Sequence, residues 1–136
     1  MKEPRVGGCQ CGALRYSVVG APIALSVCHC SECQRQSGSA FGMSLTLPRD
    51  AFRVTSGEVR TFERKADSGN TVRCSFCPDC GTRIYHEPSA MAGSVNVKAG
   101  TLDDTSWLEP VLHAWTGNKQ PWVVIPEGVR CFDEQP

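Results

Sequence analysis

Three cysteine thiols fall close together near the start of the chain, and their spacing suits a metal ion. The segment from Cys28 to Cys33 reads CHCSEC, which combines a C-x-C and a C-x-x-C spacing. One tight turn of this kind can place all its sulfurs about 2.3 Å from a common zinc ion. Because zinc prefers four ligands, the fourth decides between a closed structural site and a reactive site with an exchangeable position.

Two further cysteine pairs are flanked by glycine and predict a separate, closed site. The segment GGCQCG, which ends at Gly12, holds Cys9 and Cys11. The segment CPDCG holds Cys77 and Cys80, and a glycine again follows the second cysteine. Glycine at this point allows a turn that directs backbone N–H groups toward sulfur. Since four thiolates saturate zinc, we predict an inert structural zinc site that ties the N-terminal part of the chain to its middle.

Cys74 leaves two assignments open. It forms its own C-x-x-C with Cys77, but Pro78 stiffens the turn between Cys77 and Cys80, so we favour the later pair. The fourth ligand of the segment from Cys28 to Cys33 is then Cys74, a histidine or a water molecule. Closure by Cys74 gives a second structural zinc, and an open position gives a Lewis acid or thiolate carrier. An iron–sulfur cluster is a third interpretation of the same soft ligands.

The composition excludes several classes of function. With 136 residues, the chain is expected to form a single domain over residues 1–136. Its 14 basic and 14 acidic residues cancel, and no basic run predicts nucleic-acid binding. No apolar stretch approaches the roughly 20 residues of a membrane span, and none after Met1 resembles a secretory signal. Nine cysteines then indicate metal ligands in a reducing, cytoplasmic location rather than disulfides.

The elements that must position these cysteines are predicted to be mainly strands. Alternating apolar and polar residues predict strands, and a hairpin is expected around the turn at 67–70. Ser31 is expected to N-cap one helical turn that reaches Gln36 and closes at Gly38. No amphipathic helix of 12 residues is evident, so metal must help to hold short strands together. The expected strands cover residues 13–18, 23–27, 40–47, 59–63, 71–73, 83–86, 94–98, 112–115 and 122–125.

These motifs resemble the glutathione-dependent formaldehyde-activating enzyme family, which also includes centromere protein V. The resemblance covers nearly the whole chain. Its matching features are GCQCG, CHCSEC followed by Gly38, FCPDCG, AGTLDD from Ala99 to Asp104, and the C-terminal His113, Lys119, Pro121, Trp122 and Pro136.

The resemblance implies a β-tent fold, in which short antiparallel sheets surround a structural zinc. It also implies a second, labile zinc held by the catalytic cysteines Cys28, Cys30 and Cys33, with one open position. The family's activity is a carbon–sulfur lyase reaction: the reversible addition of glutathione to formaldehyde, which gives S-(hydroxymethyl)glutathione. An open zinc suits it, because coordination lowers the pKa of a thiol or polarises an aldehyde oxygen.

The partners implied are a small-molecule thiol such as glutathione and a small aldehyde. Glutathione carries two carboxylates, which call for cationic or N–H donors. Arg35, beside the three-cysteine segment, is the nearest candidate in sequence, although most such charges are simply solvated.

The histidines have plainer interpretations than catalysis. His29 lies between two predicted ligands and is expected to point away from the metal and pack behind it. His86 and Glu87 form a candidate acid–base pair, against an ordinary strand end. His113, in an apolar strand, is expected to be a buried or pocket-wall residue, and Cys131 a thiol that binds no metal.

The alternative function is a zinc-stapled β module that binds a protein partner without catalysis. A closed second site and a large exposed apolar patch would favour it.

Overall fold

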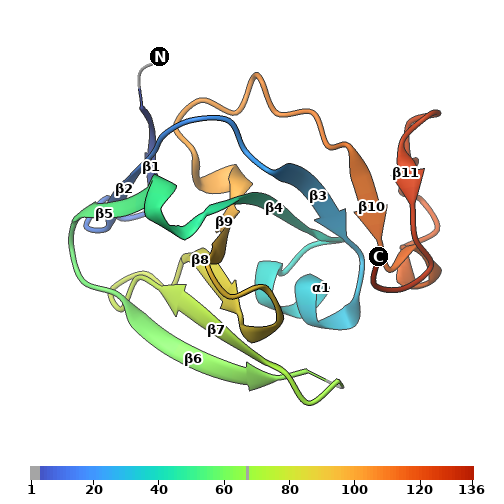
Figure 1. Cartoon of the computed structure of the whole chain (residues 1–136), viewed down its shortest axis with the longest axis horizontal. Helices are drawn as coiled ribbons and strands as arrows, with labels where there is room; N and C mark the ends of the chain where they lie inside the picture. The colour runs from blue at the N-terminus through green and yellow to red at the C-terminus, as the bar shows by residue number, and fades with distance from the viewer. Residues whose placement is uncertain (1–3, 67) are drawn as a thin grey trace.

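The computed structural model, which describes residues 4–66 and 68–136, is built mainly from short strands (Figure 1). No helix in these two ranges is both long and apolar enough to cross a membrane. The strands are β1 (Arg5–Gly8), β2 (Arg15–Val18), β3 (Ala24–Cys28), β4 (Gly42–Pro48), β5 (Phe52–Ser56), β6 (Arg60–Lys65), β7 (Thr71–Phe76), β8 (Arg83–Pro88), β9 (Ser94–Lys98), β10 (Leu112–Ala114) and β11 (Arg130–Cys131). The helices are α1 (Ser31–Ser37) and the 3-10 turns η1 (Arg49–Ala51), η2 (Ser89–Met91), η3 (Ala99–Thr101) and η4 (Thr116–Asn118).

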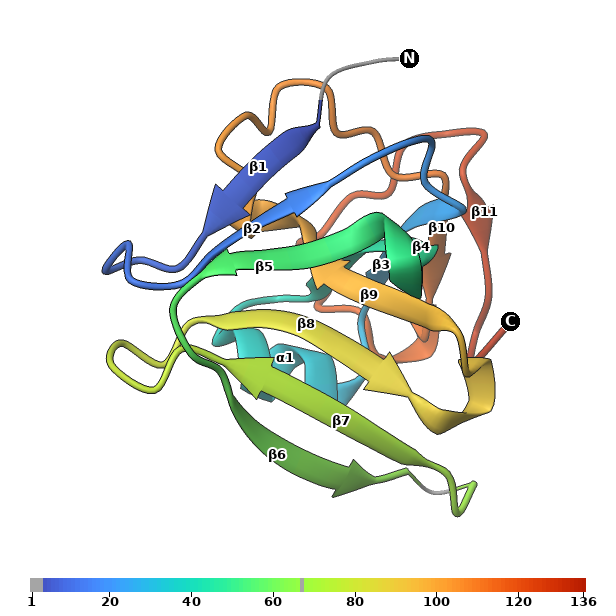
Figure 2. The same ribbon diagram turned by 60° about the vertical axis from the view of Figure 1, so that its left-hand side comes forward.

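Within the described ranges the strands form one small and one large sheet. The small sheet has the order β1-β2-β5, and the large one has the order β11-β10-β3-β4-β9-β8-β7-β6 (Figure 2). Most neighbours are antiparallel, while β10 runs parallel to both β3 and β11. The prediction of a mainly β fold with little helix is confirmed. The parallel pairs gave no signal in the sequence because β10 and β11 are too short to show periodicity.

The structure differs from the predicted set of strands in two respects. The apolar run 122–125 is not a strand, because its backbone is used locally: the Val123 N–H donates to the Gln120 carbonyl oxygen at 3.0 Å, and Lys119 Nζ donates to the Val123 carbonyl oxygen at 2.7 Å. Strands β1, β5 and β11 were not expected. The hairpin of β6 and β7 is present, although position 67 of its turn lies outside the described residues.

Aromatic rings join the two sheets and form the centre of the core. The rings of Tyr16 in β2 and Phe52 in β5 lie 5.4 Å apart between centroids, and Phe52 lies 4.5 Å from Tyr85 in β8. Such tilted pairs add to the free energy that burial of the rings already provides. Around them, alternate residues of β3, β4 and β9 turn inward, and these include Leu25, Leu45, Leu47, Val95 and Val97.

The opposite face of the large sheet is polar although much of it is half-buried. One row of neighbouring residues across the strands consists of Thr46, Asn96, His86, Cys74 and Phe62. Thr46 donates a hydrogen bond of 2.7 Å to Asn96 Oδ1. Helix α1 lies over this face, since its residues line a common pocket with Phe62 and His86. Polar side chains therefore surround the region between α1 and the sheet.

We expect Gly57→Ala to destabilise the fold strongly, because Gly57 has φ of +86° and touches the loop that carries the first cysteine pair. An added Cβ would overlap the carbonyl oxygen of Ala13 and the Cα of Leu14. The left-handed backbone alone costs about 1–3 kcal/mol for a residue with a side chain, and the overlap adds to it. Gly93→Ala is the matched control, since its φ is +88° and, apart from its chain neighbours, no atom of the described residues lies within 4 Å of its added Cβ. Urea unfolding should show the larger loss for Gly57→Ala. Equal losses would mean that the loop simply moves aside.

Candidate functional site

The four cysteines of the predicted structural site lie together. Cys9 and Cys11 are in the loop between β1 and β2, while Cys77 and Cys80 are in the loop between β7 and β8, on the same side of the molecule (Figure 2). Their Sγ atoms all lie within 4.8 Å of one another, with Cys11 Sγ 3.5 Å from Cys9 Sγ and 3.8 Å from Cys77 Sγ. Sulfurs placed ~2.3 Å from a tetrahedral zinc lie ~3.8 Å apart, so this geometry fits the ion.

Glycine shapes both of these loops. Gly12 and Gly81 have φ of 84° and 80°, and their N–H groups donate to the carbonyl oxygens of Cys9 and Cys77 at 3.1 and 2.8 Å. The turns leave the Leu14 N–H free to donate to Cys9 Sγ at 3.2 Å. Backbone donors to sulfur stabilise a thiolate, so the turns favour the charge state that binds metal.

The pKa values of the thiols in this cluster also suit a bound metal ion. Hydrogen bonds from the Thr82 hydroxyl and backbone lower the pKa of Cys80 to about 5. The Ala13 backbone lowers the pKa of Cys11, but the thiols of Cys9 and Cys80 outweigh it and raise that pKa to about 12. Neighbouring thiolates repel, so all four cannot ionise together unless a cation neutralises them.

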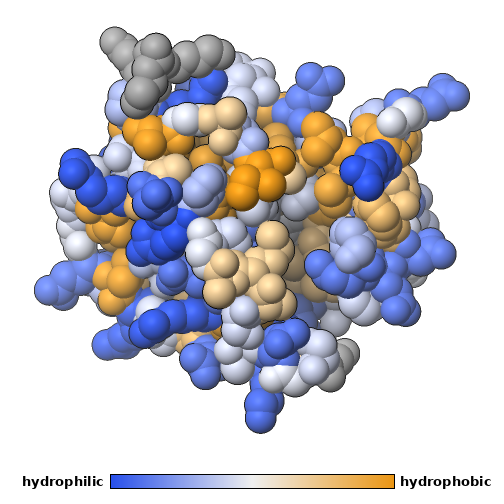
Figure 3. All heavy atoms as spheres, in the orientation of Figure 1, coloured by the Kyte–Doolittle hydropathy of each residue, from blue (hydrophilic) through white to orange (hydrophobic). Residues whose placement is uncertain are grey.

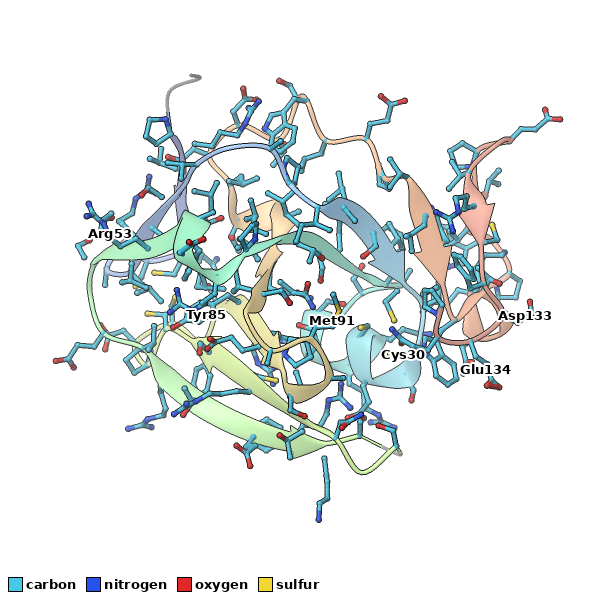
Figure 4. All side chains as sticks on the ribbon, in the orientation of Figure 1. Cys30, Arg53, Tyr85, Met91, Asp133 and Glu134 are labelled. Atoms are coloured by element: carbon cyan, nitrogen blue, oxygen red, sulfur yellow. The ribbon has the colours of Figure 1, made fainter. Side chains whose placement is uncertain are left out.

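The second cluster is formed where β3 meets α1. Cys28 ends β3, Cys30 (labelled in Figure 4) directly precedes α1, and Cys33 lies in the first turn of α1. The Sγ atoms of the three cysteines are within 4.8 Å of one another. The prediction that Ser31 is the N-cap of α1 is wrong. The N-cap is Cys30, whose Sγ accepts a hydrogen bond of 3.4 Å from the Cys33 N–H. A thiolate can accept this bond as the serine hydroxyl would, so the cap also orients a ligand. Gly38 closes the helix as predicted.

These three thiols also compete for protons. Hydrogen bonds from the Cys28 and Cys33 thiols lower the pKa of Cys30 to about 2. The same neighbourhood raises the pKa of Cys33 well above its usual range, through Cys28 first and then Cys30. One thiolate therefore forms readily and the others only with a cation present, as expected of a metal-binding thiol set.

No fourth side chain joins this cluster among the histidine, cysteine and acidic residues of 4–66 and 68–136. Cys74, the alternative ligand, lies in β7 with 1% of its surface exposed, and its Sγ points to the Val72 carbonyl oxygen at 3.7 Å. It behaves as a small buried residue, and burial raises the pKa of its thiol. The open position of the second site remains a prediction.

A buried histidine pair supports the loop from behind. The backbone N–H of His29 donates to the Ala114 carbonyl oxygen at 3.0 Å, across the parallel pairing of β3 and β10. His29 Nε2 lies 2.8 Å from His113 Nδ1, and both side chains are buried. Gln34 in α1 donates to the carbonyl oxygens of His29 and Asn118, at 2.8 and 3.1 Å. Both histidines thus hold the loop in place, in agreement with the interpretation as packing residues.

A cleft of about 250 Å³ opens between α1 and the large sheet, and Cys33 forms part of its wall. A small molecule in this cleft would lie beside Cys33, the member of the second cluster that lines it. Its lining is rich in cationic side chains. The residues that line it are Glu32, Cys33, Arg35, Gln36, Phe62, Arg64, Arg83 and His86.

Arg35 lies at the edge of this cleft. It is exposed on α1 and also lines a wider hollow of about 540 Å³ on the other side of the helix, together with Gln120 and Trp122. The candidate named from sequence is therefore near the cysteines, but it is less enclosed than Arg64 and Arg83.

His86 and Glu87 do not form the acid–base pair considered from sequence. His86 Nε2 lies 3.2 Å from Arg83 Nη1, whereas Glu87 accepts a hydrogen bond of 3.0 Å from Arg49 on the other face of the strand. Burial and then the charges of Lys98 and Arg83 lower the pKa of His86 to about 3. His86 is therefore neutral at pH 7.

Sequence reasoning missed Arg64, Phe62 and Gln36 as residues of the cleft. Arg64 and Phe62 alternate along an exposed-looking strand, and only the antiparallel pairing of β6, β7 and β8 brings them beside His86. The register of that hairpin was the one signal that could have found them.

Comparisons with known proteins give a consistent result. A family model described as glutathione-dependent formaldehyde-activating enzyme matches residues 4–118. A protein of Halomonas elongata, provisionally named as such an enzyme, is 28% identical over 137 residues, which cover 96% of this chain and 87% of that protein. A protein of Penicillium rubens with the same provisional name is 29% identical over 107 residues, which cover 75% of this chain and 55% of that protein.

The fold also has a match among crystal structures. A Rhodobacter sphaeroides protein is 21% identical, with a TM-score of 0.59 over 77% of this chain and 91% of that one. At this identity the likeness concerns the fold alone.

Proposed function

This chain belongs to the glutathione-dependent formaldehyde-activating enzyme family, and from that premise we propose that it is a zinc-dependent carbon–sulfur lyase. Its reaction would add glutathione, or a related thiol, reversibly to formaldehyde or another small aldehyde. We include in the proposal that residues 1–136 act as one domain, with Cys9, Cys11, Cys77 and Cys80 holding a structural zinc.

One observation carries the proposal: three thiols converge beside a cleft that one of them borders. Cys28, Cys30 and Cys33 lie within 4.8 Å of one another, and Cys33 borders the opening. Three protein ligands plus one exchangeable position characterise catalytic zinc, whereas four protein ligands characterise structural zinc. The two cysteine clusters of this chain differ in this respect.

The chemistry needs no redox partner. The carbon–sulfur bond forms while the carbonyl π bond breaks, and the proton of the thiol ends on the former aldehyde oxygen. Zinc held by the three cysteines would supply a positive charge that favours the thiolate form of the substrate. The residues of the chain hold the ligand set: β3 fixes Cys28, the helix cap fixes Cys30, and the His29–His113 pair fixes the loop between them.

The cytoplasm is the proposed location. All nine cysteines are free thiols, and two clusters of such thiols persist best where the environment is reducing.

The test is the rate at which glutathione and formaldehyde reach equilibrium, since they also combine without a catalyst. Exchange spectroscopy with ¹³C-formaldehyde should show a faster rate with the zinc-loaded protein and an unchanged equilibrium. Cys131→Ser is the control, because Cys131 is exposed and belongs to neither cluster. A rate equal to that of the uncatalysed reaction, with two zinc ions bound, would contradict the proposal.

The alternative, a module that binds a protein partner, has one favourable observation. Trp122 and Val124 expose 70% and 86% of their surface, and hydrophobic side chains gather over the region of β10 and β11 (Figure 3). The enzyme is preferred because this alternative gives no role to a three-thiol cluster that borders a cleft.

A further inference from the structure

The cleft beside Cys33 gathers positive charge from separate strands. Arg64 comes from β6 and Arg83 from β8, and both line the cleft. Lys98 comes from β9 on the same face of the sheet, where its Nζ donates to Ser44 Oγ at 3.3 Å. Since the sheet brings these strands together, the cations are arranged by the fold rather than by sequence neighbours.

This positive charge is poorly compensated. Glu32 is the one acidic residue that lines the cleft within the described ranges, and its carboxylate lies 3.6 Å from Arg64. Arg83 and Lys98 form no ion pair with any residue of 4–66 or 68–136. The neighbours that hold Arg83 are uncharged: His86 Nε2 at 3.2 Å and the ring of Phe62 at 5.8 Å. A cleft with low-dielectric walls and a net positive lining attracts negative charge.

A hydrogen-bond donor beside the arginines also lacks a partner. Gln36 Nε2 is buried and makes no hydrogen bond to any residue that the structure describes. Buried donors are normally satisfied, so an unpartnered one on a cleft wall indicates a ligand or water that accepts its bond. The fork of N–H groups on Arg83 suits the paired oxygens of a carboxylate.

The size of the cleft limits what it holds. Its volume of about 250 Å³ lies below the range of roughly 300–1,000 Å³ typical of sites that enclose a drug-sized ligand. It therefore suits one amino-acid-sized end of a peptide thiol. The rest of the ligand would extend past Cys33 toward the other cysteines or out into solvent.

We propose that the cleft between α1 and strands β6 and β8 binds a carboxylate of the thiol substrate, with Arg83 and Arg64 as the recognising residues. This inference rests on the proposed function for the identity of the substrate. It makes the chain selective for anionic thiols, such as a peptide thiol with a free carboxyl end, over neutral thiols of equal reactivity.

The first test measures binding without reaction. S-methylglutathione keeps both carboxylates and has no free thiol, so it measures binding to the zinc-loaded protein without reaction, and the arginine variants isolate the contribution of the cleft. Titration calorimetry or NMR should show that Arg83→Gln raises Kd by about 10-fold or more, as expected for the loss of a charged hydrogen bond. Arg64→Gln should act in the same direction and serves as the second variant if Arg83→Gln does not fold. Arg73→Gln is the matched control, because Arg73 is exposed on the opposite face of β7 and its variant also loses one positive charge.

The second test uses turnover to separate this inference from the proposed function. The wild-type protein should react faster with glutathione than with its diethyl ester, by about 10-fold or more in kcat/KM. Equal values for acid and ester, with full activity in Arg83→Gln, would overturn the cleft assignment and leave the lyase reaction standing. If no thiol reacts, S-methylglutathione decides: binding that depends on Arg83 supports the carboxylate site, and binding that is absent or insensitive to Arg83 overturns it.

Discussion

Cys77→Ser is expected to lose one zinc ion per chain and to leave most of the protein unfolded at room temperature. Cys77 has 1% of its surface exposed and belongs to the central core, together with Cys9. Its cluster joins two loops more than sixty residues apart in sequence. Structural zinc contributes an apparent ~10–16 kcal/mol in small zinc domains, which is comparable with the whole stability of ~5–15 kcal/mol of a typical domain.

The measurements are zinc content per chain and thermal unfolding by circular dichroism. Cys74→Ser is the matched control, since Cys74 is equally buried, at 1%, but lies in neither cluster. It also exchanges a buried thiol for a hydroxyl, at a cost of no more than about 1–3 kcal/mol, without the loss of a ligand. If Cys77→Ser stayed folded with two zinc ions, the cluster would not be a structural site.

The sequence predicts those parts of the site whose residues lie close together along the chain. Spacing within a few residues was enough to group Cys28 with Cys30 and Cys33, because one loop holds them. The two halves of the other cluster could also be matched from sequence, because a glycine follows the second cysteine in each: Gly12 after Cys11 and Gly81 after Cys80. The mainly β class followed from alternation in strands such as β4 and β9, whose two faces differ in polarity.

The remaining features depend on strand register, which local sequence does not specify. The side chains of Arg64 and Arg83 meet the cleft because β6, β7 and β8 pair in one particular alignment. The contact between His29 and His113 depends on a parallel pairing of β3 with a strand of three residues. The cap at Cys30 was missed for a different reason: thiols are rare caps, and serine at the next position was the better signal.

Cys30→Ser is expected to remove the second metal and the activity while leaving the fold intact. Its cluster lies at the junction of β3 and α1, and its cysteines are only half-buried, in contrast to Cys9 and Cys77. Serine is among the best N-cap residues, so its hydroxyl can accept the hydrogen bond that Cys30 Sγ now accepts from the Cys33 N–H. Compared with wild-type protein whose second site is free of metal, we therefore expect the unfolding free energy to change by less than about 1 kcal/mol, the usual worth of a cap.

The loss of activity should be far larger. Changes to residues that merely orient a metal ligand cost roughly 10–100-fold, so removal of a ligand should lower the rate of adduct formation by more than about 100-fold. Zinc content should fall from two ions per chain to one, which makes the result readable without any assay of turnover. Ser31→Ala is the control, because it changes the neighbouring hydroxyl, lies outside the cluster and leaves all three thiols in place. Retention of two zinc ions by Cys30→Ser would remove Cys30 from the ligand set. Loss of one ion with full activity would place the chemistry elsewhere in the chain.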